Sequence, residues 1–198
     1  PSPKMPRSAV QEDEMEKLYV TAKRLEEQLA SKRSVDKNRK KLCETLVDII
    51  MRDEPKHVIK ERIVYRLFRN VFYGPINTLR RRKDKILGPQ LQEALKLYKY
   101  LGNTMEERLM VGTDHEVEMS QGAETKPVED KAGILRMLYE LLLNMGDFYR
   151  YGSQREEAVN TYERMLRFCP GGTAAFIQIA VCLQEAGQQF NALYAYAR

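Results

Sequence analysis

The sequence has little of what membrane proteins, metal sites and disulfide-rich domains need. No run of about 18 apolar residues occurs in its 198 residues, so it predicts no transmembrane helix. Its three cysteines are odd in number and not at metal-site spacings, and we expect reduced, mostly buried thiols. The two histidines, His57 and His115, lie beside charged residues in expected surface segments and are not placed to form a metal pair. We therefore expect no metal and no cofactor.

Glycine and proline are also scarce, and the composition is 43% hydrophobic and 31% charged, which is typical of a helical globular protein. Apolar residues recur at helical spacing almost throughout, and no segment alternates like a strand. We therefore predict an all-α fold in a single domain, 1–198. The N-terminus lacks an initiator Met and the C-terminus stops inside an apolar-periodic helix, so we expect this chain to be part of a longer, C-terminally extended protein.

Turn residues and capping patterns divide this periodicity into helices. The first helix follows Ser8 and the second carries Leu42, Leu46, Val47 and Ile50. A third runs from about residue 56 through the 80s with a kink at Gly74-Pro75, because proline cannot donate a backbone hydrogen bond. A fourth follows Gly88-Pro89, and residues 112–130, acidic and without a period, are predicted to be a mobile loop. Further helices are expected over 131–151, after a capping box at 153–156, after the turn at 170–173, and from about 189.

The last third contains the tetratricopeptide pattern, in which Gly, Tyr, Ala, an aromatic residue and Pro stand at positions 8, 11, 20, 24 and 32 of a 34-residue unit. With Gly146 at position 8, the others fall on Tyr149, Ala158, Tyr162 and Pro170. A weaker second copy has Ala180, Leu183, Ala192 and Tyr196. We predict tetratricopeptide-type helix pairs over about 146–198, with small residues that allow close helix approach and aromatics that fill between the helices.

Positive charge is concentrated in residues 56–85, which hold ten Lys or Arg against two acids, +8 in a chain of net charge +5. Helical geometry places Arg62, Arg66, Arg69 and Tyr73 on one stripe, opposite an apolar face. A solvated face explains such a stripe, and so does an anion site, since a guanidinium fork suits phosphate oxygens. The RRRKDK cluster at 80–85 is either a solvated helix end or a nucleic-acid or nuclear-import patch.

Arg150 and Tyr151 are not required by the tetratricopeptide pattern. Arg150 could pair with Asp147 as a weak surface ion pair, or could reach across a groove toward the basic stripe. Arginines together with a tyrosine hydroxyl would suit a phosphorylated side chain of charge about −2.

GDFYRY at 146–151, the A-x-x-x-Y spacing after it and the final A-x-Y-x-Y-x-R resemble the N-terminal domain of the nonsense-mediated-decay SMG adaptors and the related telomerase-recruitment proteins. KNRKKLC and LFRNVFY are more similar to the SMG-five branch than to the SMG-seven branch. The resemblance spans nearly the whole chain, is closest over 37–73 and 144–198, and slightly favours the SMG-five branch. It implies a 14-3-3-like helical fold that merges into tetratricopeptide-type repeats. In that family phosphoserine is held by a helix-three basic residue, which falls on Arg69, and by an Arg-Tyr pair, which falls on Arg150-Tyr151.

Two departures from the family pattern indicate a weakened phosphate site. Family members usually have Asn after the aromatic residue that follows the Pro-Gly turn, where this sequence has Ile177. A second helix-three basic residue would fall near Ile76-Asn77 and is absent. We therefore predict a phosphopeptide-binding set of Arg69, Arg150 and Tyr151, with Arg66 and Arg62 from the same stripe.

The resemblance implies a non-enzymatic adaptor in mRNA decay, which pairs with a paralogous SMG-seven-like adaptor and helps to recognise a phosphorylated decay helicase. Decay machinery or a phosphatase would be recruited through regions outside this chain, and the location would be cytoplasmic, with nuclear shuttling left open. No nucleophile–base constellation or Gly-rich phosphate loop indicates an enzyme. Two alternatives remain at this point: nucleic-acid binding by the basic helix, and a plain tetratricopeptide scaffold in which Arg150 is incidental.

Overall fold

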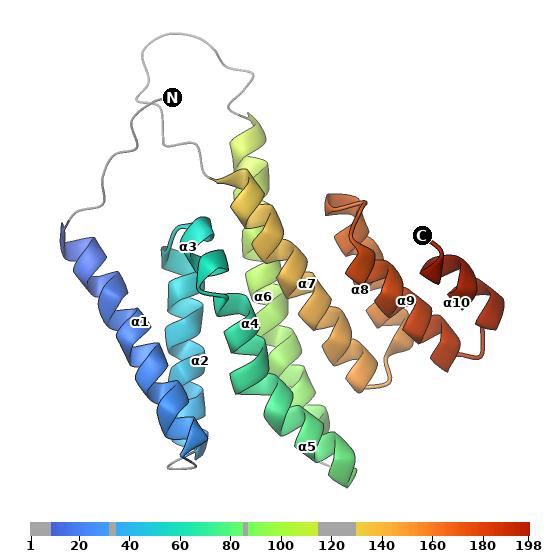
Figure 1. Ribbon diagram of the computed structural model, residues 1–198, viewed down its shortest axis with the longest axis horizontal. Coiled ribbons are helices and arrows are strands. Elements are labelled where there is room, and N and C mark those ends of the chain that lie inside the picture. The colour runs from blue at the N-terminus through green and yellow to red at the C-terminus, as the bar shows by residue number, and fades with distance from the viewer. Residues whose placement is uncertain (1–8, 32–34, 85–86, 115–129) are drawn as a thin grey trace. The chain divides into compact units, whose positions relative to one another are not determined.

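The computed structural model describes residues 9–31, 35–84, 87–114 and 130–198, and these ranges are helical with short connections and contain no strand (Figure 1). The all-α prediction is therefore confirmed. The chain divides into two compact units, each described by itself below. The first comprises residues 1–74 and 108–134, and the second comprises 75–107 and 135–198.

The first unit is built from an antiparallel pair of helices and a series of shorter helical segments. Helix α1 (Ala9–Ala30) packs against α2 (Val35–Arg52), and α2 in turn contacts α3 (Pro55–Lys60), α4 (Ile63–Arg66) and the π-helix η1 (Leu67–Tyr73). The predicted stripe of α2 forms the core here, since Leu42, Leu46 and Ile50 are fully buried. The predicted start of the first helix is confirmed at Ala9, and the preceding residue, Ser8, lies outside the described residues.

A buried carboxylate fixes the turn between α2 and α3. Asp53 is only 3% exposed; its Oδ1 accepts a hydrogen bond from the Glu54 backbone N–H at 2.7 Å, and its Oδ2 accepts one from the Tyr19 hydroxyl at 2.6 Å. Pro55 then begins α3, where a missing N–H costs nothing. The Asp-Glu-Pro sequence therefore forms the start of this helix.

The prediction of one continuous helix from about 56 through the 80s is wrong. Arg62 adopts a left-handed conformation with φ of 53° and separates α3 from α4. Beyond it the chain stays helical, but residues 67–73 widen into a π-helix immediately before α5 (Gly74–Arg82). A π-turn is a known way to absorb an irregularity in a helix, and Pro75 supplies the reason for one, because it cannot donate to the preceding turn.

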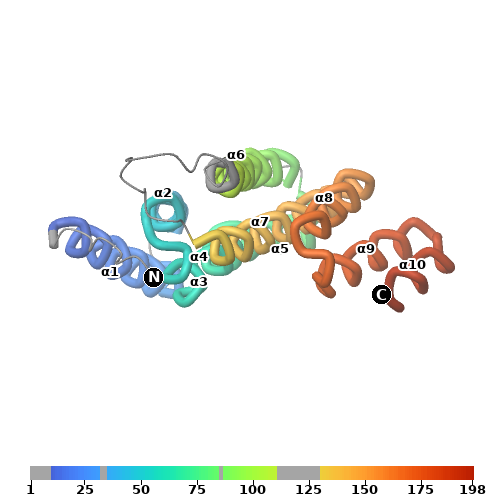
Figure 2. The backbone as a smooth tube through the Cα atoms, turned by 90° about the horizontal axis from the view of Figure 1, so that it is seen from above, coloured from blue at the N-terminus to red at the C-terminus, as the bar shows by residue number. Residues whose placement is uncertain are grey.

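The second unit contains α5 from Pro75, α6 (Leu87–Asp114) up to residue 107, α7 (Lys131–Tyr151) from residue 135, α8 (Arg155–Phe168), α9 (Thr173–Glu185) and α10 (Gln189–Tyr196). Helices α8 and α9, and α9 and α10, pack as successive antiparallel neighbours, which Figure 2 shows from above. The predicted bounds of α7 are confirmed at both ends. One detail differs, since residues 112–114 belong to α6 rather than to the predicted loop. The remainder of that loop up to 129 lies outside the described residues.

The proposed capping box at 153–156 is also wrong, although α8 begins where it was expected. Ser153 has a φ of 60°, and the residue that precedes the helix is Gln154, without a side-chain capping hydrogen bond. The backbone of Ser153 turns the chain in the left-handed region, so its hydroxyl is not placed to cap α8.

Candidate functional site

The tetratricopeptide signature builds the platform on which Arg150 stands. A Cβ placed on Gly146 would lie 2.3 Å from Cε1 of Tyr162, so glycine is required where α7 meets the ring from α8. Tyr162 is fully buried, as is Ala158 one turn earlier. The packing roles that the pattern predicts for these residues are therefore confirmed in the α7–α8 pair, where the small residues allow the two helices to approach closely.

The Tyr162 ring brings a hydroxyl to a buried acid. Its O–H donates to Asp147 Oδ1 at 2.8 Å, and the Asp147 side chain is 15% exposed. Burial raises the pKa of this carboxyl above its usual range, although the Tyr162 hydrogen bond and Arg150 both oppose the shift. Burial likewise raises the pKa of the Tyr162 phenol, and Asp147 raises it further.

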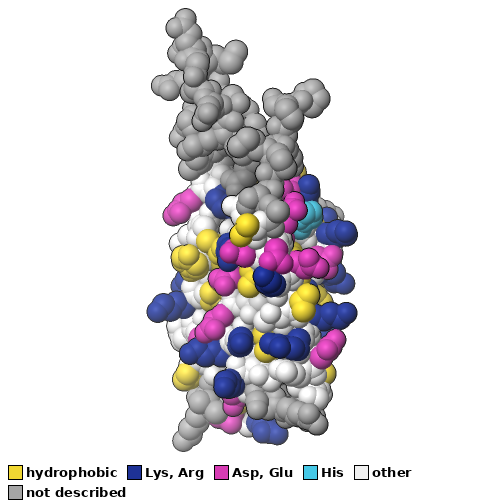
Figure 3. Space-filling view, turned by 90° about the vertical axis from the view of Figure 1, so that its left-hand side faces the viewer, with side chains coloured by type: hydrophobic (Ala, Val, Ile, Leu, Met, Phe, Trp, Pro, Cys, Tyr) yellow, Lys and Arg dark blue, Asp and Glu magenta, His cyan; other side chains and the backbone are white. Residues whose placement is uncertain are grey.

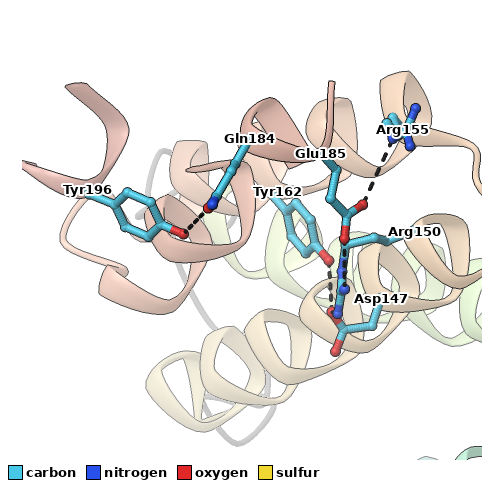
Figure 4. A network of polar contacts seen from close by, with 7 residues as sticks. All are labelled: Asp147, Arg150, Arg155, Tyr162, Gln184, Glu185 and Tyr196. Carbon is cyan, nitrogen blue, oxygen red and sulfur yellow. Dashed lines mark hydrogen bonds and ion pairs between the residues drawn. The ribbon is translucent and has the colours of Figure 1, made fainter. Parts of the chain in front are cut away.

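Arg150 lies among carboxylates from two helices (Figure 4). Its Nη2 is 3.5 Å from Asp147 Oδ1, and its Nη1 is 3.8 Å from Glu185 Oε1 at the end of α9; Glu185 is shared with Arg155. These distances exceed the 2.7–2.9 Å or so of a short charge-assisted hydrogen bond, and the Nε of Arg150 is buried with no hydrogen-bond partner among the described residues. The guanidinium is thus held in place by charge, while its hydrogen-bonding capacity is incompletely used.

This arrangement corrects one alternative from the sequence. The pair with Asp147 was expected at the surface, but the Arg150 side chain is only 17% exposed. Burial lowers the pKa of its guanidinium, and the charge of Asp147 together with the Tyr162 hydroxyl more than offsets this, so the pKa moves upward and the group stays a cation.

Tyr151 completes the group at the end of α7. The Cζ of Arg150 is 5.0 Å from the centroid of its ring, and the Cζ of Arg80, from α5, is 4.9 Å from the same centroid. Both distances are within the range of a cation–π contact. Two guanidinium groups therefore approach one half-buried tyrosine within the second unit.

The other predicted residues lie in the first unit, and one of them is already occupied. Arg66 binds Glu26 of α1 in a bidentate ion pair, with Nε and Nη2 each 2.9 Å from a carboxylate oxygen. Asn70 donates to the same carboxylate at 2.9 Å. Arg66 would have to break its ion pair with Glu26 to bind a phosphate. The structure therefore shows Arg66 linking α4 to α1, and not as a free cation on the predicted basic stripe.

Arg62 and Arg69 are both exposed and flank Tyr65. The Arg62 Cζ is 4.3 Å from the ring centroid, and Arg69 donates from Nη1 to the Tyr65 hydroxyl at 2.7 Å. Tyr65 therefore orients the Arg69 side chain from one turn away. Sequence reasoning did not select Tyr65, although its i−4 spacing from Arg69 was a usable signal.

The α9 position at which the family pattern has Asn is open. Ile177 is 44% exposed, while the side-chain Oε1 of the next residue, Gln178, is buried and has no hydrogen-bond partner in the described part of the chain. The exposed isoleucine cannot form the backbone hydrogen bond that an Asn would supply.

The surface charges of the first unit are mixed. On the side where α1 lies, Figure 3 shows Lys and Arg side chains interspersed with Asp and Glu rather than collected into one basic face. Ion pairs such as Arg52 with Glu14 and Lys17 with Asp13 account for part of this pattern. Across the described residues, no group of three or more His, Cys, Asp or Glu could hold a metal ion. None of the described helices combines the length and apolarity that crossing a membrane requires.

Comparison with known proteins shows the fold. No family model matches the chain, and no curated protein matches it in sequence. A solved structure is similar to the chain in fold: the C. elegans SMG5-SMG7 complex, with a TM-score of 0.62 and 17% sequence identity, covering 92% of this chain and 47% of that chain. The chain therefore has the helical, 14-3-3-like architecture of that protein, and it spans about half of the neighbour's length.

Proposed function

We propose that this chain is the 14-3-3-like domain of a non-enzymatic adaptor in nonsense-mediated mRNA decay, and that Arg150 and Tyr151 recognise a phosphorylated segment of a decay helicase. The likeness in fold supports an adaptor scaffold of this type. The observation that carries the proposal is that Gly146 and Tyr162 are explained by helix packing, whereas Arg150 and Tyr151 are not.

Charge and hydrogen bonding favour a phosphate as the ligand. Arg150 remains a cation, and its Nη groups lie 3.5 Å and 3.8 Å from the two carboxylates. A phosphate has more charge than either carboxylate and three strong acceptor oxygens, so it can compete for these donors. The resemblance adds Arg69, whose side chain is exposed and oriented by Tyr65. Ile177 lacks the polar group of the expected Asn, so we propose a site of reduced affinity.

The test is a titration with serine-phosphorylated and unphosphorylated copies of one peptide from the decay helicase, followed by fluorescence anisotropy. Wild type should bind the phosphorylated copy more tightly, and Arg150→Glu should weaken that binding at least about 10-fold, since a charge-assisted hydrogen bond contributes about 1.5–3 kcal/mol. Arg155→Glu is the matched control, because Arg155 also pairs with Glu185 and its substitution changes the net charge by the same amount. Equal binding of both peptides, or equal effects of the two substitutions, would overturn the proposal.

Arg69 is tested separately in the first unit. Arg69→Glu should weaken binding of the phosphorylated copy, whereas Lys60→Glu, an exposed residue that ends α3, should have little effect. If both variants bind like wild type, Arg69 is not part of the site, and the proposal for Arg150 and Tyr151 stands or falls on its own titration.

We further propose that the domain forms a heterodimer with a paralogous SMG-seven-like adaptor, with the SMG-five branch slightly preferred for this chain. The support is that the neighbour of like fold was solved as a complex of two such adaptors. Light scattering after size-exclusion chromatography should show a 1:1 complex when the two domains are mixed. Two persistent monomers at micromolar concentration would argue against pairing through these domains.

Nucleic-acid binding is the second candidate, and the observation that favours it is the exposed Arg80, Arg81 and Arg82 at the end of α5. This candidate predicts that the chain binds RNA with an affinity that falls steeply as the salt concentration rises. Replacing each of the three arginines in turn should lower that affinity by about the same factor. Weak, salt-insensitive binding to RNA would exclude it.

A further inference from the structure

The three arginines at 80–82 are identical in sequence, but their side chains have different surroundings in the structure. Arg80 alone of the three contacts the candidate site, since its Cζ lies 4.9 Å from the centroid of the Tyr151 ring. The sequence offered two interpretations of this cluster, a solvated helix end and a nucleic-acid or import patch, and neither accounts for a guanidinium held at the end of another helix.

Arg80 and Arg150 together give Tyr151 two cationic neighbours. Because the two distances to the ring centroid are 4.9 Å and 5.0 Å, the two Cζ atoms are at most about 10 Å apart, and like charges at that separation repel each other. Arg150 has carboxylates beside it, but no carboxylate in the described ranges lies within ion-pair distance of Arg80. The cation contributed by α5 is therefore not neutralised by the protein described here.

We infer that Arg80 is the second cation of the phosphate site, acting with Arg150 across Tyr151 and making the site selective for a dianionic phosphate over a carboxylate. This inference rests on the proposed function and names its ligand class. The family pattern leaves the second helix-three basic position empty at Ile76-Asn77, and Ile76 is buried. Arg80, one helical turn further along, supplies that charge from an exposed position whose guanidinium reaches Tyr151.

The physical reason is a match of charge. A phosphoserine carries about −2 near neutral pH, whereas a glutamate carries −1 and has a planar carboxylate with two oxygens. With Arg150 partly compensated by Asp147 and Glu185, one cation would bind either anion weakly. Arg80, which forms no ion pair with a carboxylate of the described residues, adds an attraction that is larger for the dianion, and its fork can donate to two oxygens at once.

The experiment compares three copies of one decay-helicase peptide that differ at a single position, with phosphoserine, serine or glutamate. Arg80→Ala should weaken binding of the phosphoserine copy about 10-fold and reduce the preference for phosphoserine over glutamate. Arg81→Ala is the matched control, since Arg81 is exposed, lies next in the same helix and makes the same change in net charge. Circular dichroism and thermal melting of both variants verify that the fold is retained.

The outcomes separate this inference from the proposed function. If wild type does not distinguish phosphoserine from serine, both fail. A second outcome is that wild type prefers phosphoserine, Arg150→Glu abolishes that preference, and Arg80→Ala and Arg81→Ala each lose little affinity for the phosphoserine copy. In that case the proposed function stands and the role of Arg80 is overturned. If Arg80→Ala and Arg81→Ala weaken binding equally and by about 10-fold, the effect is one of general charge, and the specific role of Arg80 is also overturned.

Discussion

Arg66 in the first unit and Arg150 in the second are both largely buried arginines beside carboxylates, yet they are held in different ways. Arg66 makes two hydrogen bonds of 2.9 Å to Glu26, a carboxylate that Asn70 also contacts. Arg150 lies 3.5 Å and 3.8 Å from its two carboxylates, with its Nε unpaired within the described chain. The two side chains are about equally buried, so they differ in how fully their hydrogen-bonding groups are used. We propose that this difference separates an arginine that links two helices from one that can bind a ligand.

The largest expected effect comes from breaking the platform beneath Arg150. Gly146→Ala would drive a methyl group into the fully buried Tyr162 ring, and we expect the second unit to lose about 2–3 kcal/mol of unfolding free energy through overpacking. The matched control is Gly102→Ala in α6, where an added Cβ has no neighbour within 4 Å and should stabilise the helix by about 0.5–1 kcal/mol. Urea denaturation followed by circular dichroism measures both; equal effects would contradict the packing account.

A smaller effect should separate the two arginine environments directly. Glu26→Gln leaves the Arg66 fork with one neutral acceptor, and we expect a loss of about 1–2 kcal/mol, because the pair is partly exposed and its charges are partly screened. Asp147→Asn keeps an oxygen that can accept from Tyr162, and burial already raises the pKa of this carboxyl, so neutralising it should cost less than about 1 kcal/mol. The same denaturation measurement applies, and a larger loss from Asp147→Asn would reverse the comparison.

These two variants rest on contacts that the sequence predicted only in part. The tetratricopeptide spacing identified Gly146, Ala158 and Tyr162 because each packing role requires a particular residue size. Pro and Gly in the turn at 170–173 marked the boundary between α8 and α9. The pairing of Arg150 with Asp147 followed from their i−3 spacing. Glu185 and Glu26, by contrast, are distant in sequence from their partners, and a single sequence holds no signal for such contacts.

The hydrophobic periodicity of the sequence also gave no sign of the backbone irregularities. The apolar residues at 63–72 recur much as they would in an α-helix, so periodicity did not reveal the left-handed Arg62 or the π-helix at Leu67–Tyr73. Pro75 indicated a disturbance near its position, but not the form that it takes. The same limit applies to Arg80, which the sequence could not distinguish from Arg81 because only the fold brings one of them to Tyr151.

An effect of comparable size should appear at alkaline pH. Burial raises the pKa of both Tyr19 and Tyr162, and hydrogen bonds to Asp53 and Asp147 raise them further. Because the folded pKa lies above the unfolded value of about 10, the stability that each phenol contributes is complete below about pH 10 and is lost as the pH rises beyond it. Between pH 9 and 11, wild type should lose about 1 kcal/mol more per tyrosine than Tyr19→Phe or Tyr162→Phe.

Denaturant midpoints at pH 9 and 11 give this difference, and the phenylalanine variants correct for the other groups that titrate in the same range. Tyr162 is fully buried and Tyr19 only partly, so the difference should be at least as large for Tyr162. Identical pH dependence in wild type and both variants would contradict the two phenol–carboxylate hydrogen bonds.

The central claim is that Arg150 is available to a phosphorylated ligand and Arg66 is not. The most direct measurement follows the arginine Nε–Hε signals by NMR, assigned with Arg150→Lys and Arg66→Lys, during titration with the phosphorylated decay-helicase peptide. We predict that the Arg150 signal shifts in step with binding, while the signal of Arg66, which is bound to Glu26, does not shift. A peptide that binds and moves the Arg66 signal, or leaves the Arg150 signal unchanged, would contradict it.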